Sequence, residues 1–194
     1  FEGDNMEYDY YTRRLHIRMV SSEDIGQVLD FQKRNRLYFE QYEEPKSDDF
    51  YTTAIQQRIL IAEKCALSDD SFFRYYLSPA YDTSYIIGTI SLKKYVHNRT
   101  SSMLIGYKID HAMWRQRYAY EALSYLIPRI FLSGLTDRLE ALVNPDNKAS
   151  VSLLRKLGFM WSPDDSIYRN TPGGRILHHL YFLDSGISVS DTHQ

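Results

Sequence analysis

Three stretches with the character of β-strands follow one another in the middle of the chain, and only short turns separate them. They cover residues 72–77, 85–95 and 102–109, and the segments between them contain turn-forming residues such as Pro79 and Asn98. Connections this short cannot return the chain to the start of a parallel neighbour. The sequence therefore predicts an antiparallel meander, around which the rest of the fold must be built.

Helical patterns lie on both sides of this meander. Ahead of it, cap-forming oxygens up to Asp24 predict the start of one helix, and a second helix is predicted from about residue 49 to residue 64. After it, apolar residues at steps of three and four predict a long helix over residues 119–131. A strand is expected at residues 138–143, and the helix before it favours parallel pairing with the last strand of the meander.

The remaining elements lie near the two ends of the chain. Asn147 can cap a helix that Gly158 ends in the left-handed conformation. Further strands are expected at residues 15–19, 159–161 and 176–183. This order predicts an α/β fold in which helices flank a mixed, mostly antiparallel sheet of about six to seven strands.

The chain has the length and composition of one soluble domain. At 194 residues it can bury a core without covalent cross-links, and we expect the domain to cover residues 13–184, between an N-terminal extension (1–12) and a polar tail (185–194). A net charge of −2 gives no general attraction to nucleic acid or to a membrane surface. The single cysteine, Cys65, cannot form an internal disulfide, and the N-terminus lacks the pattern of a signal peptide. These features predict a cytoplasmic protein.

Two sequence phrases carry a resemblance to a known family. The first ends a strand with Gly106-Tyr107-Lys108-Ile109 and opens a helix with Trp114-Arg115-Gln116-Arg117-Tyr118-Ala119-Tyr120-Glu121-Ala122-Leu123. It resembles the acetyl-CoA signature of RimJ/RimL-type acetyltransferases of the GNAT superfamily, W-G-x-G-Y-A-x-E-A-L. The second, at residues 147–159, resembles the family phrase N-x-x-S-x-x-x-L-x-K-L-G-F. The resemblance covers about residues 13–184 and implies the GNAT fold.

The resemblance implies transfer of an acetyl group from acetyl-CoA to a primary amine by direct attack, without an acyl-enzyme and without a metal. The N-terminus of the long helix that follows Trp114 offers free N–H groups and a positive dipole to a pyrophosphate, over residues 115–120. A main-chain N–H near Ile109 would serve the oxyanion. The residues expected to bind the cosubstrate are Tyr107, Lys108, Ile109, Arg115, Gln116, Arg117, Tyr118, Ala119, Tyr120, Asn147 and Ser150.

The chain departs from the family where Arg115 and Arg117 replace two glycines. Glycine takes left-handed angles freely, whereas another residue there costs about 1–2 kcal/mol. We expect the loop to keep right-handed angles, with both guanidinium groups paired to phosphate oxygens. In the alternative, the site has lost its ligand and the protein is a catalytically impaired binding module with a degraded CoA site.

Asn147 and Ser150 are the candidate catalytic side chains. Asn147 could hold the pantetheine or a water, or could simply cap its helix, and Ser150 could donate to the thioester sulfur or bond backbone. Many relatives place a tyrosine acid where this chain has Leu154, so the donor to the leaving thiolate is Ser150 or water. Glu121 is expected to support the helix start and not to act as a base.

Histidines and the cysteine give no metal site. His178 and His179 are adjacent on a predicted strand, so their side chains face opposite ways and cannot hold one metal, although one of them could face the acceptor. Cys65 is expected to be a buried small apolar group.

The acceptor is an amine of a class that the sequence leaves open. Aromatic residues between the first helices, with Glu40, Glu43 and Glu44 among them, would attract a cationic amine if they line a cleft. A peptide N-terminus, a polyamine and an aminoglycoside all fit, and the resemblance favours a protein α-amine. No nucleic-acid partner and no membrane partner are expected, and family analogy alone suggests a homodimer.

Overall fold

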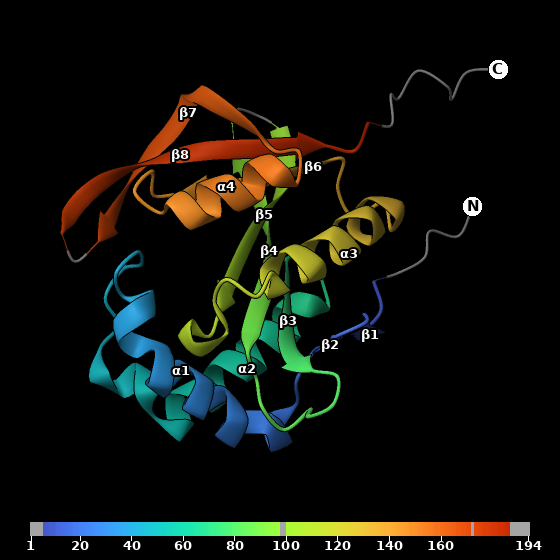
Figure 1. The fold of residues 1–194 in the computed structure, drawn as a ribbon, viewed down its shortest axis with the longest axis vertical. Helices are drawn as coiled ribbons and strands as arrows, with labels where there is room; N and C mark the ends of the chain where they lie inside the picture. The colour runs from blue at the N-terminus through green and yellow to red at the C-terminus, as the bar shows by residue number, and fades with distance from the viewer. Residues whose placement is uncertain (1–5, 98–99, 172, 187–194) are drawn as a thin grey trace.

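An eight-stranded sheet with the order β1-β2-β3-β4-β5-β6-β8-β7 forms the centre of the computed structural model, which describes residues 6–97, 100–171 and 173–186 (Figure 1). The strands are β1 (Asp9–Tyr11), β2 (Leu15–Arg18), β3 (Phe72–Pro79), β4 (Gly88–His97), β5 (Thr100–Ile109), β6 (Arg138–Val143), β7 (Met160–Thr171) and β8 (Gly174–Asp184). The α-helices are α1 (Ile25–Phe39), α2 (Thr53–Leu67), α3 (Tyr118–Leu132) and α4 (Lys148–Lys156).

The predicted meander is confirmed. Strands β3, β4 and β5 pair antiparallel in chain order, with Tyr75 opposite Ile90 and Ile90 opposite Tyr107. The sheet has one strand more than the six to seven expected, because β1 pairs with β2 at its edge. The segment 1–12, expected to be an extension ahead of the domain, thus contributes a strand to the sheet.

Helices pack on both faces of the sheet because alternate residues of each strand face opposite ways. On β3, Tyr76 packs against Val28 and Phe31 of α1. The neighbouring residue Tyr75 belongs instead to the main core, which also contains Leu126 of α3. The face covered by α1 and the face covered by α3 are therefore opposite sides of the same sheet, and α2 lies beside α1 (Figure 1).

The C-terminal half follows the predicted order, with one element longer than expected. Strand β6 runs parallel to β5, and Gly158 ends the α4 region with a φ of +90°, as predicted. Strand β7 extends far beyond the expected residues 159–161, and its pairing with β8 shifts register between Ser162 and Ile167. Pro163, which lacks an N–H for the ladder, lies within this irregularity. Within the described ranges, no helix has the length and apolar character to cross a bilayer.

Candidate active site

Strands β5 and β6 separate after a short contact, which opens a gap inside the sheet. They pair only at Met103–Leu139 and Leu104–Glu140, although β5 continues to Ile109 and β6 continues to Val143. On the other side of β5, the N–H of Asp110 donates to the carbonyl of Ile87 at 2.8 Å. Because an antiparallel ladder alternates, the main-chain groups of Ile109 and Tyr107 point away from β4 and into this gap.

The far end of the gap carries a free donor and a buried tyrosine. The carbonyl of Ile109 accepts from Trp114 Nε1 at 2.8 Å, which leaves the N–H of Ile109 as the gap-facing donor. Tyr107 reaches across from β5, and its hydroxyl lies 3.4 Å from the carbonyl of Ser150 on α4. Burial raises the pKa of Tyr107 to about 12, so its hydroxyl keeps its proton at neutral pH.

The loop ahead of α3 has the backbone of a glycine loop although it carries arginines. Arg115 and Arg117 have φ values of 61° and 63°, so the expectation of right-handed angles is wrong. The loop is held from both ends, since Trp114 is bonded to Ile109 and the carbonyl of Gln116 accepts from Arg14 Nη1 at 3.0 Å. These anchors impose the left-handed angles despite a cost of about 1–2 kcal/mol each.

The start of α3 is open to an anion. Arg117 is the N-cap residue and makes no side-chain cap, so the N–H groups of the first turn, Tyr118 to Tyr120, have no side-chain partner among the residues that the structure describes. Arg115, Gln116 and Arg117 are exposed, and neither guanidinium forms an ion pair with a described residue. Backbone N–H groups and the positive end of the helix dipole therefore lie at the end of a loop that carries two exposed cations.

Glu121 holds this loop in place. Its carboxylate accepts from Thr12 Oγ1 at 2.6 Å, from Arg14 N at 3.0 Å and from Arg14 Nε at 2.6 Å. The Arg14 guanidinium also lies 4.4 Å from the ring centre of Tyr118. Burial alone would raise the pKa of Glu121, but the bonds from Thr12 and Arg14 outweigh it, and the pKa lies below its ordinary value. Glu121 is thus an ionised support.

The structure places the other sequence-predicted residues on two sides of the gap. Asn147 caps α4, because its Oδ1 accepts from the N–H of Ser150 at 3.1 Å. Of these two residues, Ser150 lies beside the Tyr107 hydroxyl, through its carbonyl. Lys108 does not face the gap: its Nζ lies 2.6 Å from Glu43 and 4.9 Å from the ring centre of Phe39, on the α1 side of the sheet. Burial lowers the pKa of Lys108 although Glu43 opposes the effect.

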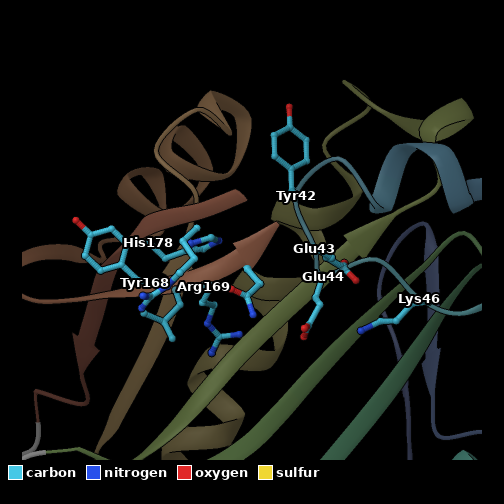
Figure 2. A pocket seen from close by; sticks show the side chains of 10 residues that line it. Tyr42, Glu43, Glu44, Lys46, Tyr168, Arg169 and His178 are labelled. Carbon is cyan, nitrogen blue, oxygen red and sulfur yellow. The ribbon is translucent and has the colours of Figure 1, made fainter. Parts of the chain in front are cut away.

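A cleft of about 660 Å³ opens on that same side of the sheet. Tyr42, Glu43 and Glu44 line it from the segment after α1, and Tyr168, Arg169 and His178 line it from β7 and β8 (Figure 2). Leu142 of β6 also lines the cleft and thereby connects it to the gap.

Two of the three acidic residues that the sequence suggested for this region are occupied by internal partners. Glu40, which the sequence suggested as an attractor of cations, accepts from the Tyr51 hydroxyl at 2.9 Å and lies 3.2 Å from Arg36 Nε. Glu43 is paired with Lys108. Of the expected acidic residues, Glu44 alone has no ion pair with a described residue. The cleft therefore presents less free negative charge than the sequence indicates.

His178 is a buried titratable residue that lines the cleft. It is 5% exposed, and its Nδ1–H donates to the carbonyl of Ile176 at 3.1 Å, which leaves Nε2 as an acceptor. Burial lowers the pKa of His178, so the ring is neutral at pH 7. His179 faces the other way and stacks on Trp161 with ring centres 4.9 Å apart. Sequence alternation indicated that one of the pair could face the acceptor but could not say which.

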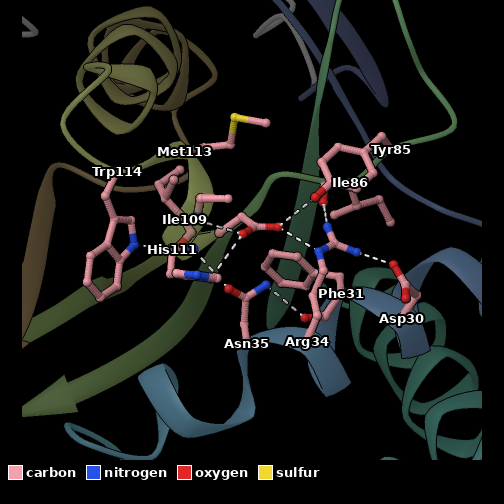
Figure 3. Close-up of polar contacts among 12 residues, drawn as sticks. Asp30, Phe31, Arg34, Asn35, Tyr85, Ile86, Ile109, His111, Met113 and Trp114 are labelled. Carbon is pink, nitrogen blue, oxygen red and sulfur yellow. Dashed lines mark hydrogen bonds and ion pairs between the residues drawn. The ribbon is translucent and has the colours of Figure 1, made fainter.

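A buried polar network that the sequence did not reveal fixes the end of β5 (Figure 3). Asp110 is 1% exposed and accepts from Arg34 Nε at 2.6 Å and from the N–H of Ala112 at 3.0 Å. Asn35 accepts from the N–H of His111 at 2.9 Å. Helix α1 thus holds the two residues that follow Ile109. Cys65, expected to be buried, is exposed on α2.

The fold and the opened sheet place the chain among the acetyltransferases. It belongs to the acetyltransferase (GNAT) domain family, whose model matches residues 14–160. It is 29% identical over 147 residues to the probable N-acetyltransferase YjcK of Bacillus subtilis, covering 76% of this chain and 81% of that protein. It is 26% identical over 149 residues to the [ribosomal protein uS5]-alanine N-acetyltransferase of Escherichia coli, covering 76% of both. Among solved structures, Mycobacterium smegmatis RimJ in complex with CoA-disulfide has a TM-score of 0.76 at 17% identity, covering 88% of this chain and 82% of that one.

Proposed function

We propose that the protein transfers an acetyl group from acetyl-CoA to the α-amine of a protein by direct attack. One observation carries this proposal: β5 and β6 part between a helix N-terminus on one face of the sheet and a cleft on the other. Two substrates can approach such a gap from opposite faces and meet inside it. The uS5-alanine enzyme of E. coli, named for a protein α-amine acceptor, supports this choice over a polyamine or an aminoglycoside.

The residues fit the cosubstrate on the α3 side. The N–H groups at Tyr118, Ala119 and Tyr120 face a diphosphate, and the exposed Arg115 and Arg117 supply charge-assisted bonds to it. The pantetheine arm lies in the gap, where the main-chain groups of Tyr107 and Ile109 bond to it as to an added strand.

Residues of the gap and of the cleft supply the chemistry of transfer. The amine nitrogen forms a bond to the thioester carbon, whose oxygen becomes negative and accepts from the N–H of Ile109. Nε2 of His178 receives the proton that the amine loses, directly or through water. The carbon–sulfur bond then breaks, and the thiolate takes a proton from water, Ser150 or the Tyr107 hydroxyl, which burial keeps protonated.

Calorimetry with CoA and a free-thiol assay with acetyl-CoA test the proposal together. We expect heat on CoA binding, and thiol release that depends on an added peptide with a free α-amine. CoA binding without thiol release across peptides, polyamines and aminoglycosides would instead support a binding module. The left-handed angles at Arg115 and Arg117 count against that module, because they keep the phosphate-binding backbone in place.

A further inference from the structure

Resting on the proposed acetyl transfer, we infer that the acceptor is a peptide with an anionic side chain at its second or third residue, which Arg169 binds. The cleft that receives the acceptor is lined by three basic residues, Lys46, Arg169 and Arg175, against two acidic ones, Glu43 and Glu44. Since Glu43 is already paired with Lys108, the free charge of this cleft is basic.

Arg169 and Arg175 are available to a ligand. Arg169 is exposed on β7, and Arg175 is exposed on β8 with its guanidinium 5.3 Å from the ring centre of Tyr168. Neither arginine forms an ion pair with any residue that the structure describes. Two cations beside a concave surface, neither of them paired with a described carboxylate, are suited to a carboxylate or a phosphate.

The position of Arg169 along the hairpin sets the spacing. Arg169 lies opposite Ile176 and Ile167 lies opposite His178, so Arg169 and His178 face the same side of the sheet. Leu142, opposite Leu180, shares that side and borders the gap. Arg169 lies two residues along β7 from Ile167, the partner of His178, and two residues of a strand span about 7 Å. An amine placed at His178 therefore brings the second or third residue of an extended peptide to Arg169.

The experiment measures kcat/KM for thiol release with peptides that begin with alanine and differ only at their second or third residue. Each position carries aspartate, phosphoserine, asparagine or lysine in turn. At one of the two positions we expect at least a tenfold preference for aspartate over asparagine, with phosphoserine at least as good and lysine worst. Comparing aspartate with phosphoserine distinguishes the two sources of negative charge.

Variants assign the preference to the arginines. R169Q should reduce kcat/KM for the aspartate peptide to that of the asparagine peptide, and R169E should favour the lysine peptide. R58Q is the matched control, because Arg58 is an exposed arginine on α2 away from the cleft, and it should leave every value unchanged. Melting curves of R169Q should match the parent, since its guanidinium has no described ion pair to lose.

The possible outcomes distinguish failure of the anionic-acceptor inference from failure of the proposed acetyl transfer. Equal kcat/KM for the aspartate and asparagine peptides would overturn the anionic acceptor while acetyl transfer stands. A preference for aspartate that survives in the R169Q/R175Q double variant would overturn the assigned residues. Failure to acetylate any peptide would remove both conclusions.

Discussion

Arg34 Nε lies 2.6 Å from Asp110 Oδ2, and this contact joins α1 to the residue that follows the last strand residue of β5. Asp110 is 1% exposed, and the Arg34 side chain is 22% exposed. The N–H of Ile109, the proposed oxyanion donor, therefore lies one residue from a buried ion pair. The position of that donor depends on α1 as well as on the sheet.

Replacing Asp110 should cost stability. Burial alone would raise its pKa, but bonds from Arg34 and from the N–H of Ala112 hold the pKa below its ordinary value. D110N leaves the Arg34 charge without its buried partner, and we expect unfolding free energy to fall by about 3 kcal/mol in urea titrations. D30N is the control, because Asp30 contacts the same arginine but is 65% exposed, and it should cost about 0.2–1 kcal/mol. Similar losses in the two variants would contradict a special role for Asp110.

Glycine at the two left-handed positions should stabilise the protein while weakening CoA binding. In R115G and R117G, relief of about 1–2 kcal/mol is offset by added chain flexibility of about 0.5–1 kcal/mol, so each unfolding free energy should rise by up to about 1.5 kcal/mol. The double variant should bind CoA about tenfold more weakly at low salt, because it loses two partly solvated ion pairs.

Alanine at the same positions separates backbone from charge. R115A and R117A keep the left-handed strain and remove the guanidinium, so they should lose CoA affinity without gaining stability. Tighter CoA binding in the glycine variants, measured by calorimetry, would show that the arginines obstruct the site.

Glu121 should prove to be a support and not a base. E121Q retains the shape but loses the charge that Thr12 and Arg14 bond, and we expect a loss of about 1 kcal/mol, limited by the partial exposure of Arg14. The kcat for acetyl transfer should change by only a few-fold. A fall in kcat of about 100-fold or more, as removal of a general base gives, would contradict this assignment.

Two variants separate the helix-capping role of Asn147 from a contact of its amide with the cosubstrate. N147D keeps an oxygen that accepts from Ser150 N and should retain stability, whereas N147A should lose about 1 kcal/mol with the cap. If the amide also contacts the cosubstrate, kcat/KM should fall in both. Full activity in N147D would leave Asn147 with the capping role alone.

His178 should impose a pH dependence on rate and stability. Burial lowers the pKa of His178 below 6.5, its ordinary value in the unfolded chain. Between the folded-state pKa and pH 6.5, the unfolded chain therefore binds more protons than the folded one. Its contribution to stability is therefore complete above pH 6.5 and is lost as pH falls below that value. We expect H178Q to remove this component when melting temperatures are compared between pH 5 and 7.5, and to lower kcat by about 100-fold or more at pH 7. Unchanged kcat would exclude the ring as proton acceptor.

Local periodicity was sufficient to predict most of the fold. The meander, the apolar face of α3 and the cap and stop residues of α4 depend on neighbours in sequence, so the pattern reveals them. Strand β1 was missed because three residues are too few to show alternation. Strand β7 was underestimated because Pro163 and the acidic residues after it interrupt the pattern in the middle of the strand.

The parts of the site that depend on a short sequence motif could be predicted. The parts that depend on residues brought together by folding could not. The helix N-terminus and the Asn147 cap were both visible, but the ion pair between Arg34 and Asp110 spans residues 76 apart in the chain. The occupation of Glu40 and Glu43 by internal partners was hidden for the same reason. Dimerisation, a cytoplasmic location and the roles assigned to site residues stay predictions.

The short contact between β5 and β6 makes this sheet an interrupted one, held together across the middle by two residue pairs. A thioester arm bonded to both free edges would act as a missing strand and link the two halves. The amide hydrogens of β6 and β8 should then exchange with solvent more slowly whenever the ligand is bound, although only the edge of β6 touches it. Slower amide exchange in these two strands would therefore indicate that the ligand is bound.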